Sequence, residues 1–174
     1  MIEALMLTLI HEAPRVMADP HDYGARANIM WAGMMAHNNS CGVGRTQDWS
    51  SHNLEHELSA LYDCAHGAGL AVAMPATFTY VMNEDVMRFD KVAVRVWGCD
   101  MDFEHPEKTA KAGIDALLRF LKSIGMPTNF AELGAREEDI DYLAETMVKG
   151  RNGVYRGFCT LTKEDCAEIY RLMV

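Results

Sequence analysis

The feature that most constrains the fold is the helical spacing of apolar residues, which runs through nearly the whole chain. Residues 2–18 show it first, with Leu5, Leu9 and Val16 recurring on one side of a helix. No convincing segment alternates apolar and polar residues at the period of two that a half-buried strand requires. The chain is therefore predicted to be all-α, with about eight helices.

Pro, Gly and capping residues set the predicted boundaries. Asp19 and Pro20 are predicted to end the first helix and open the second, with Asp19 as its N-cap. Pro75 falls inside the fourth helix and is expected to kink or delay it. Thr162 precedes Asp165 by three residues and predicts a capped final helix. The predicted helices cover residues 2–18, 20–39, 49–62, 66–82, 84–97, 106–123, 136–148 and 163–172, and residues 40–48 and 150–160 are predicted loops.

Composition excludes several classes of protein. A length of 174 residues suits one domain, and 49% hydrophobic residues can build a substantial core. The formal charge of −9, with no basic stripe, argues against nucleic acid as a partner. No apolar run approaches the roughly 18 residues of a membrane span. The five cysteines show no C-x-x-C spacing and no signal peptide is visible, so we expect reduced thiols in a cytoplasmic protein.

Histidines concentrate between Trp49 and Pro75. Three of the seven, His52, His56 and His66, fall within fifteen residues. His52 and His56 are four apart, so they share one face of a helix. Convergent imidazoles are the commonest way to hold a borderline transition metal. The spacing therefore favours a metal site, with surface or capping histidines as the alternative.

Spacing alone does not complete such a site. The zinc-protease motif fails, because His56-Glu57 is followed by Leu, Ser and Ala rather than by a second histidine at the required position. The carboxylates inside the cluster are Glu55, Glu57 and Asp63. Glu55 and Glu57 project about 100° away from the flanking histidines on an ideal helix. None of the three is well placed, so the residues leave the remaining ligands open.

The histidine run also resembles a known family. Residues 48–76, DWSSHNLEHELSALYDCAHGAGLAVAMPA, closely resemble the metal-site region of the iron-containing alcohol dehydrogenases. The likeness covers essentially the whole chain, including DPHDYGARANIMWAGMMAHNN before this run and LTKEDCAEIYRLMV at the C-terminal end. The most similar branch is that of the NAD(P)H-dependent butanol dehydrogenases and aldehyde reductases.

The resemblance implies an architecture. Family members have two domains, an N-terminal α/β domain that binds NAD(P)H and an all-helical C-terminal domain, like that of dehydroquinate synthase, that carries the metal. Residues 1–174 are thus expected to form a single helical metal-binding domain, truncated at its N-terminal end. No cofactor-binding residues are expected in it, because the chain has no Gly-rich phosphate loop.

The resemblance also implies roles for individual residues. His52 and His66 would ligate Fe²⁺ or Zn²⁺, and His56 would be catalytic, in a proton relay beside the nicotinamide. His37 and Trp49 are candidates for the substrate pocket. The family takes its other two protein ligands, an Asp and a His, from one upstream helix. The metal site is therefore expected to be incomplete in this chain.

The function implied for the full-length enzyme is the NAD(P)H-dependent interconversion of small primary alcohols and aldehydes. The isolated chain is expected to be inactive. It is also expected to form a homo-oligomer, because loss of a domain would expose an apolar interface. Two alternatives remain open: a non-enzymatic truncated paralogue that acts as a helical oligomer or interaction module, and one half of a split dehydrogenase.

Overall fold

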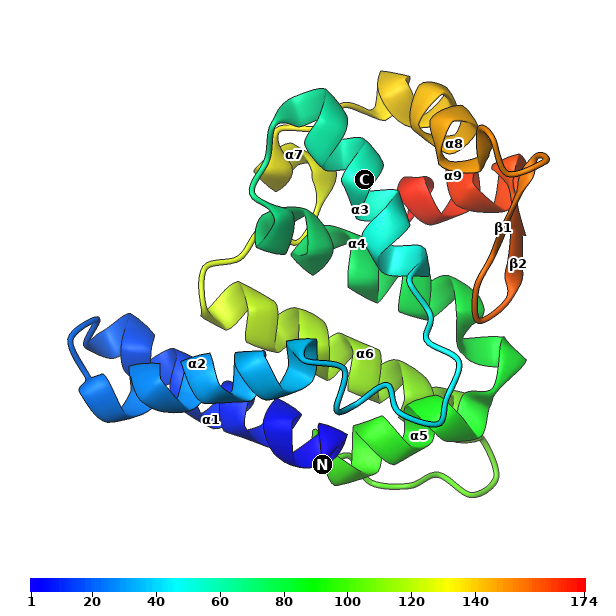
Figure 1. Ribbon diagram of the computed structural model, residues 1–174. Helices are drawn as coiled ribbons and strands as arrows, with labels where there is room; N and C mark the ends of the chain where they lie inside the picture. The colour runs from blue at the N-terminus through cyan, green and yellow to red at the C-terminus, as the bar shows by residue number, and fades with distance from the viewer. The chain divides into compact units, whose positions relative to one another are not determined.

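The computed structural model describes residues 1–174 (Figure 1). It contains nine α-helices, two short 3-10 helices and one two-stranded hairpin, which confirms the predicted all-α class. None of the helices combines the length and the apolar character that a membrane crossing needs. In chain order the elements are α1 (Ile2–Ala18), α2 (Tyr23–His37), α3 (Ser50–Tyr62), α4 (His66–Val81), η1 (Met82–Glu84), α5 (Val86–Arg95), α6 (Pro106–Ser123), α7 (Phe130–Leu133), η2 (Glu137–Asp139), α8 (Ile140–Val148), β1 (Val154–Arg156), β2 (Thr160–Thr162) and α9 (Lys163–Arg171).

The chain divides into two compact units. The first unit comprises Met1–Thr46 and Met87–Ile124, and the second comprises Gln47–Val86 and Gly125–Val174. The first therefore holds α1, α2, α5 and α6, and the second holds the other helices and the hairpin. All three clustered histidines lie in the second unit, so its internal packing decides how they meet.

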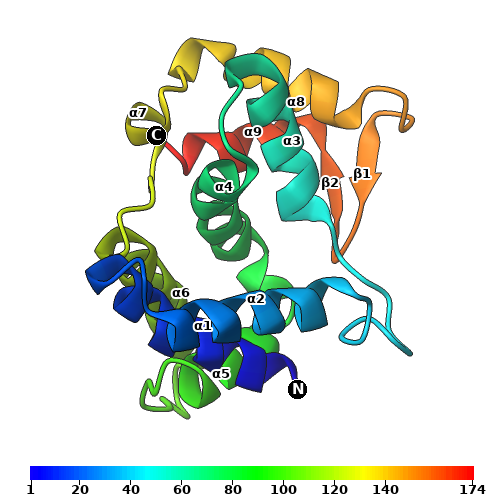
Figure 2. The ribbon, with the colours of Figure 1, turned by 60° about the vertical axis from the view of Figure 1, so that its left-hand side comes forward.

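In the first unit, α1 and α2 lie side by side (Figure 2). Glu12 is buried on α1, and its carboxylate accepts hydrogen bonds from Arg15 at 2.8 Å and from Asn28 of α2 at 3.1 Å. These bonds offset the cost of removing the carboxylate from water. Farther along the chain, α5 and α6 approach closely where Gly113 faces Ala93.

In the second unit, α3 packs against α4 and α8, and α9 packs against α4 and α8. Burial of apolar side chains between these helices is the main force that holds them together. The fully or almost fully buried apolar side chains of this core include Leu54, Leu58, Val72, Leu143, Met147, Ile169 and Tyr170. The core thus fixes the two helices, α3 and α4, that carry the histidines.

The connection between α1 and α2 differs from the prediction. Asp19 is the C-cap of α1, and its side chain accepts a 2.9 Å hydrogen bond from the backbone N–H of His21. The N-cap of α2 is instead Asp22, which accepts from the backbone N–H of Ala25 at 3.0 Å. The assignment of Asp19 as N-cap was therefore wrong, because its carboxylate bonds within the turn, a common alternative to capping for Asp.

Residues 150–160 also differ from the predicted loop. They contain β1 and the start of β2, which pair antiparallel with Tyr155 opposite Leu161. Each strand has three residues, and only the middle one is buried. A strand of three residues is too short to show the alternation of apolar and polar residues, so this pattern did not predict the hairpin. Helix α7 has only four residues, too few to show a helical period, and it was missed for that reason.

Helix α4 runs from His66 to Val81 with Pro75 inside it, so Pro75 does not delay the start of this helix.

Candidate metal centre

Helices α3 and α4 bring the three histidines together. His52 and His56 lie one turn apart on α3, and His66 is the first residue of α4. The ring centroid of His66 lies 5.4 Å from those of both His52 and His56, and the latter two are 6.4 Å apart. Two imidazole nitrogens on one Zn²⁺ lie roughly 3.4 Å apart, given tetrahedral bonds of about 2.0–2.1 Å. By these centroid distances, His66 is the ring nearest to both of the others.

Local interactions fix both ends of α3. Asp48 accepts hydrogen bonds from the backbone N–H of Ser50 at 3.2 Å and from its hydroxyl at 2.6 Å, which tie the preceding loop to the first residue of α3, whose N-cap is Trp49. At the other end, Asp63 takes a left-handed φ of 50° and ends the helix as predicted. Only Cys64 and Ala65 then separate it from α4. This short return places His66 beside α3.

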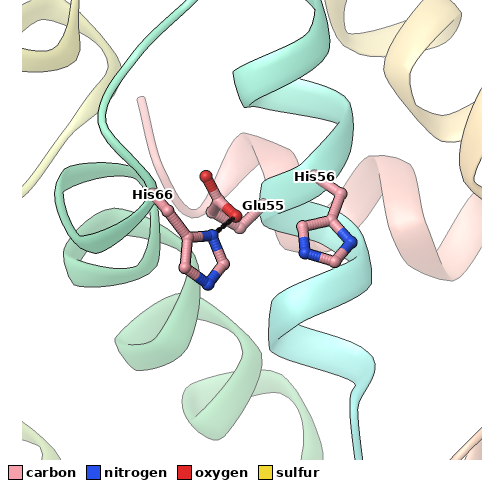
Figure 3. A group of neighbouring side chains, drawn as sticks. All are labelled: Glu55, His56 and His66. Atoms are coloured by element: carbon pink, nitrogen blue, oxygen red, sulfur yellow. Dashed lines mark hydrogen bonds and ion pairs between the residues drawn. The ribbon is translucent and has the colours of Figure 1, made fainter.

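Glu55 lies on α3, is 0% exposed and contacts His66 directly. Its Oε2 atom meets His66 Nδ1, and its Oε1 atom accepts a hydrogen bond from the Ser59 hydroxyl. Figure 3 shows the carboxylate against one edge of the His66 ring, with the other ring nitrogen on the far edge. Sequence reasoning considered Glu55 only as a metal ligand and missed this contact. The available signals were Ser59, four residues on, and Gly69, three residues after His66.

The donor atoms at this site suit a divalent transition metal. Glu55, His56 and His66 each place one potential ligand atom within 4.8 Å of the others, and the His52 ring is adjacent. The His66 side chain is 50% exposed, so an ion can reach it from solvent. Imidazole is a favoured ligand of both zinc and iron. The residues present thus fit part of the coordination shell of Fe²⁺ or Zn²⁺.

The surroundings of His52 favour its neutral form. Partial burial lowers the pKa of His52 below its ordinary value, and the neighbouring rings of His66 and His56 lower it further. A neutral imidazole is the form that ligates a metal. Trp49 packs edge-on against His52 with ring centroids 4.9 Å apart, and remains 45% exposed. Trp49 therefore borders the histidine cluster, and its role in a substrate pocket stays a prediction.

His37 is the remaining predicted site residue. It is exposed and ends α2, in the first unit, whereas the histidine cluster belongs to the second. The residues that the second unit brings together are therefore His52, His56, His66, Glu55 and Trp49. The pocket role of His37 stays a prediction.

Comparison with known proteins identifies the family. Residues 1–174 match the model of the Fe-containing alcohol dehydrogenase family, C-terminal. The chain is 34% identical over 170 residues to NADH-dependent butanol dehydrogenase A of Clostridium acetobutylicum, covering 97% of this chain and 43% of that protein. It is 32% identical over 145 residues to the NADPH-dependent aldehyde reductase YqhD of Escherichia coli, covering 83% of this chain and 37% of that protein.

Solved structures agree with the sequence match. The chain superimposes on NADH-dependent butanol dehydrogenase A from Thermotoga maritima with a TM-score of 0.92 and 35% identity, over 99% of this chain and 44% of that one. The fold is all-helical apart from one hairpin, and three histidine rings meet within it. The chain belongs to the Fe-containing alcohol dehydrogenase family and corresponds to its C-terminal part, which confirms the predicted family. It spans less than half the length of these relatives.

Proposed function

We propose that residues 1–174 are one metal-binding domain that serves an NAD(P)H-dependent alcohol dehydrogenase, with His52 and His66 as ligands to Fe²⁺ or Zn²⁺. The observation that carries this proposal is the convergence of three imidazoles, with the His66 ring centroid 5.4 Å from each of the other two. The relatives support it, since their names describe reduction or oxidation with NADH or NADPH. The substrates proposed here are small primary alcohols and aldehydes.

Each residue has a defined task in this proposal. When bound, the divalent ion supplies Lewis acidity for an alcohol or aldehyde oxygen. His52 and His66 hold the ion, and Trp49 limits access of water on the His52 side. His56 is exposed on α3 and passes the alcohol proton between the site and solvent at a ring nitrogen, for which an imidazole suits neutral pH.

Two imidazoles leave the coordination shell unfilled, so the proposed enzyme needs further ligands beyond the residues described above. Its reaction with NAD(P)H also needs a dinucleotide-binding site beyond these residues. We therefore expect these 174 residues, purified alone, to show no NAD(P)H-dependent aldehyde reduction.

Self-association is a further part of the proposal. It is supported by large exposed apolar side chains on α2, namely Tyr23, Met30 and Trp31.

Metal binding tests the proposal directly. Zn²⁺ is titrated calorimetrically into the metal-free chain, the His52→Ala/His66→Ala double variant and a control, His21→Ala, which removes an exposed histidine from the turn before α2. One-to-one binding that weakens at least about tenfold in the double variant and not in the control supports the proposed ligands. Equal binding by all three proteins contradicts them and favours a non-catalytic helical module.

A further inference from the structure

Glu55 is a carboxylate buried between α3 and α4, with no exposed surface. Burying a charged group is costly unless hydrogen bonds satisfy it, so the contacts of Glu55 indicate its task. We infer that Glu55 is a positioning residue: it holds the ring of His66 by Nδ1 and so presents Nε2 to the metal. This inference rests on the proposed function of His66 and specifies how the ring is fixed.

Both oxygens of Glu55 are already engaged. Oε2 meets Nδ1 of His66, and Oε1 accepts the hydrogen bond of the Ser59 hydroxyl. An ionised carboxylate can only accept hydrogen bonds, so Nδ1 carries the hydrogen. In a neutral imidazole the other nitrogen then has the free lone pair. The arrangement therefore selects the tautomer in which Nε2 is the ligand atom, as outer carboxylates do at many metal sites.

A rival interpretation makes Glu55 a direct ligand, together with His56 and His66. Their potential ligand atoms do lie within 4.8 Å of one another. However, the carboxylate oxygen nearest His66 faces Nδ1, and an ion placed between those two atoms would displace the hydrogen bond. Glu55 is also fully buried whereas the side chain of His66 is 50% exposed, so an ion on Glu55 would have to enter the layer between the helices. Burial and contact together favour positioning over ligation.

Helix α4 leaves room for the Glu55 carboxylate because the residue that faces it, Gly69, has no side chain. A Cβ atom at Gly69 would lie 2.6 Å from Glu55 Oε1 and 2.7 Å from its Cγ, distances that real Cβ atoms do not show. Glycine in a helix interior is less favourable than alanine, so its presence here needs a reason. A Cβ atom at Gly67, two residues earlier on α4, would meet nothing within 4 Å, so that glycine makes no comparable room. The glycine at 69 thus preserves the position of Glu55.

The first experiment measures the His66 tautomer in the metal-free chain. Long-range ¹H–¹⁵N correlation spectra at a pH where His66 is neutral distinguish Nδ1–H from Nε2–H, with His66→Ala giving the assignment. The wild-type chain is expected to show Nδ1–H. Glu55→Leu, which removes the acceptor and keeps an apolar side chain in the core, should abolish that preference. Glu55→Gln keeps a carbonyl acceptor and should retain it in part.

The second experiment measures Co²⁺ affinity and the visible spectrum of the bound ion. Glu55→Leu and Gly69→Ala should each weaken binding by about 10–100-fold while leaving the spectrum at saturation unchanged, because no ligand is lost. Gly67→Ala is the matched control and should bind as the wild type does. Circular dichroism establishes that each variant is folded; if Gly69→Ala is not, Glu55→Leu and Glu55→Gln still decide the question.

Three results would overturn the inference. They are an Nε2–H tautomer in the wild type, an unchanged tautomer and affinity in Glu55→Leu, and a changed spectrum at saturation in that variant, which would make Glu55 a ligand. The tautomer is read without any metal. A failure of the proposed metal site therefore leaves the positioning test intact, and the two outcomes are distinguishable.

Discussion

The hydroxyl of Tyr170 donates a 2.8 Å hydrogen bond to the backbone carbonyl oxygen of Leu54, joining α9 to the helix that carries the histidines. Both residues are 0% exposed, and Leu54 directly precedes Glu55. Tyr170→Phe removes the donor and keeps the ring. We expect it to lower the free energy of unfolding by about 1–2 kcal/mol, because the buried carbonyl loses a partner. Urea unfolding followed by circular dichroism measures the change.

The control for this prediction is Tyr142→Phe, on the neighbouring helix α8. Tyr142 is 59% exposed, so loss of its hydroxyl should change the free energy of unfolding by less than about 0.5 kcal/mol. Equal effects of the two substitutions would mean that the bond from Tyr170 to Leu54 adds nothing specific to stability.

The raised pKa of Tyr80 should make the free energy of unfolding depend on pH in the alkaline range. Its hydroxyl donates to the Asp165 carboxylate, and this bond, with burial, raises the pKa of Tyr80 from 10.0 to about 12. Above pH 10 the unfolded chain loses this proton while the folded chain keeps it. The free energy of unfolding contributed by Tyr80 should therefore be full below pH 10 and fall as pH rises toward 12. The change is followed by urea unfolding at a series of pH values.

Tyr80→Phe separates the contribution of Tyr80 from those of other groups that titrate at alkaline pH, such as Cys166, whose pKa burial raises to about 12. Its unfolding free energy should depend less steeply on pH between 10 and 12 than that of the wild type. At pH 7 the variant should be less stable, because Asp165 loses one hydrogen-bond donor. Parallel curves for the two proteins would show that Tyr80 titrates alike in the folded and unfolded chains.

Local patterns explain why so many helix boundaries were predictable. The capping box of α9 needs only Thr162 and Asp165, three residues apart, and both of its hydrogen bonds form. Pro106 in the first turn of α6 is equally local, and α6 runs over Pro106–Ser123 as predicted. Where two nearby residues compete, as Asp19 and Asp22 do before α2, the sequence does not decide which one caps. The turn geometry does.

The contact between Glu55 and His66 depends on packing and was not predictable in the same way. On an isolated α3, Glu55 points away from the neighbouring histidines. Only the return of α4 brings His66 to it, and only the missing side chain of Gly69 leaves the space. The hairpin also depends on packing, because it contacts α8 and α9, and the Tyr155 hydroxyl accepts a 3.2 Å hydrogen bond from Asn53 of the distant helix α3.

Helices α5 and α6 pack so closely at Gly113 that a side chain there would collide with Ala93. A Cβ atom there would lie 2.6 Å from the Cβ and 2.9 Å from the Cα of Ala93. Gly113→Ala should therefore lower the free energy of unfolding by about 1–3 kcal/mol through overpacking, despite the better helix propensity of alanine. Thermal and urea unfolding measure the loss.

Gly33 provides the matched comparison, within α2 of the same unit. A side chain at this exposed position meets nothing within 4 Å. Gly33→Ala should raise the free energy of unfolding by up to about 1 kcal/mol, from helix propensity alone. A stabilising Gly113→Ala would mean that α5 moves away from α6 without cost.

Asp90 on α5 is a buried carboxylate of the opposite kind to Glu55. It is 2% exposed, and neither oxygen has a hydrogen-bond partner of normal geometry. Burial raises the pKa of Asp90 above 3.8, an effect that the nearby backbone N–H of Ala110 offsets in part and Glu107 reinforces. The folded chain therefore holds this proton more tightly than the unfolded chain, so stability falls as pH rises above 3.8 and remains reduced at neutral pH.

Asp90→Ala should accordingly raise the free energy of unfolding at pH 7 by about 1–3 kcal/mol, because it removes an unsatisfied buried carboxylate. The gain over the wild type should shrink as pH falls, because below pH 3.8 the carboxyl becomes protonated in both states. Asp115→Ala is the control: Asp115 is an exposed partner of Lys111, and its loss should change stability by less than about 0.5 kcal/mol. A destabilised Asp90→Ala at pH 7 would instead mean that the folded chain stabilises the charge of Asp90.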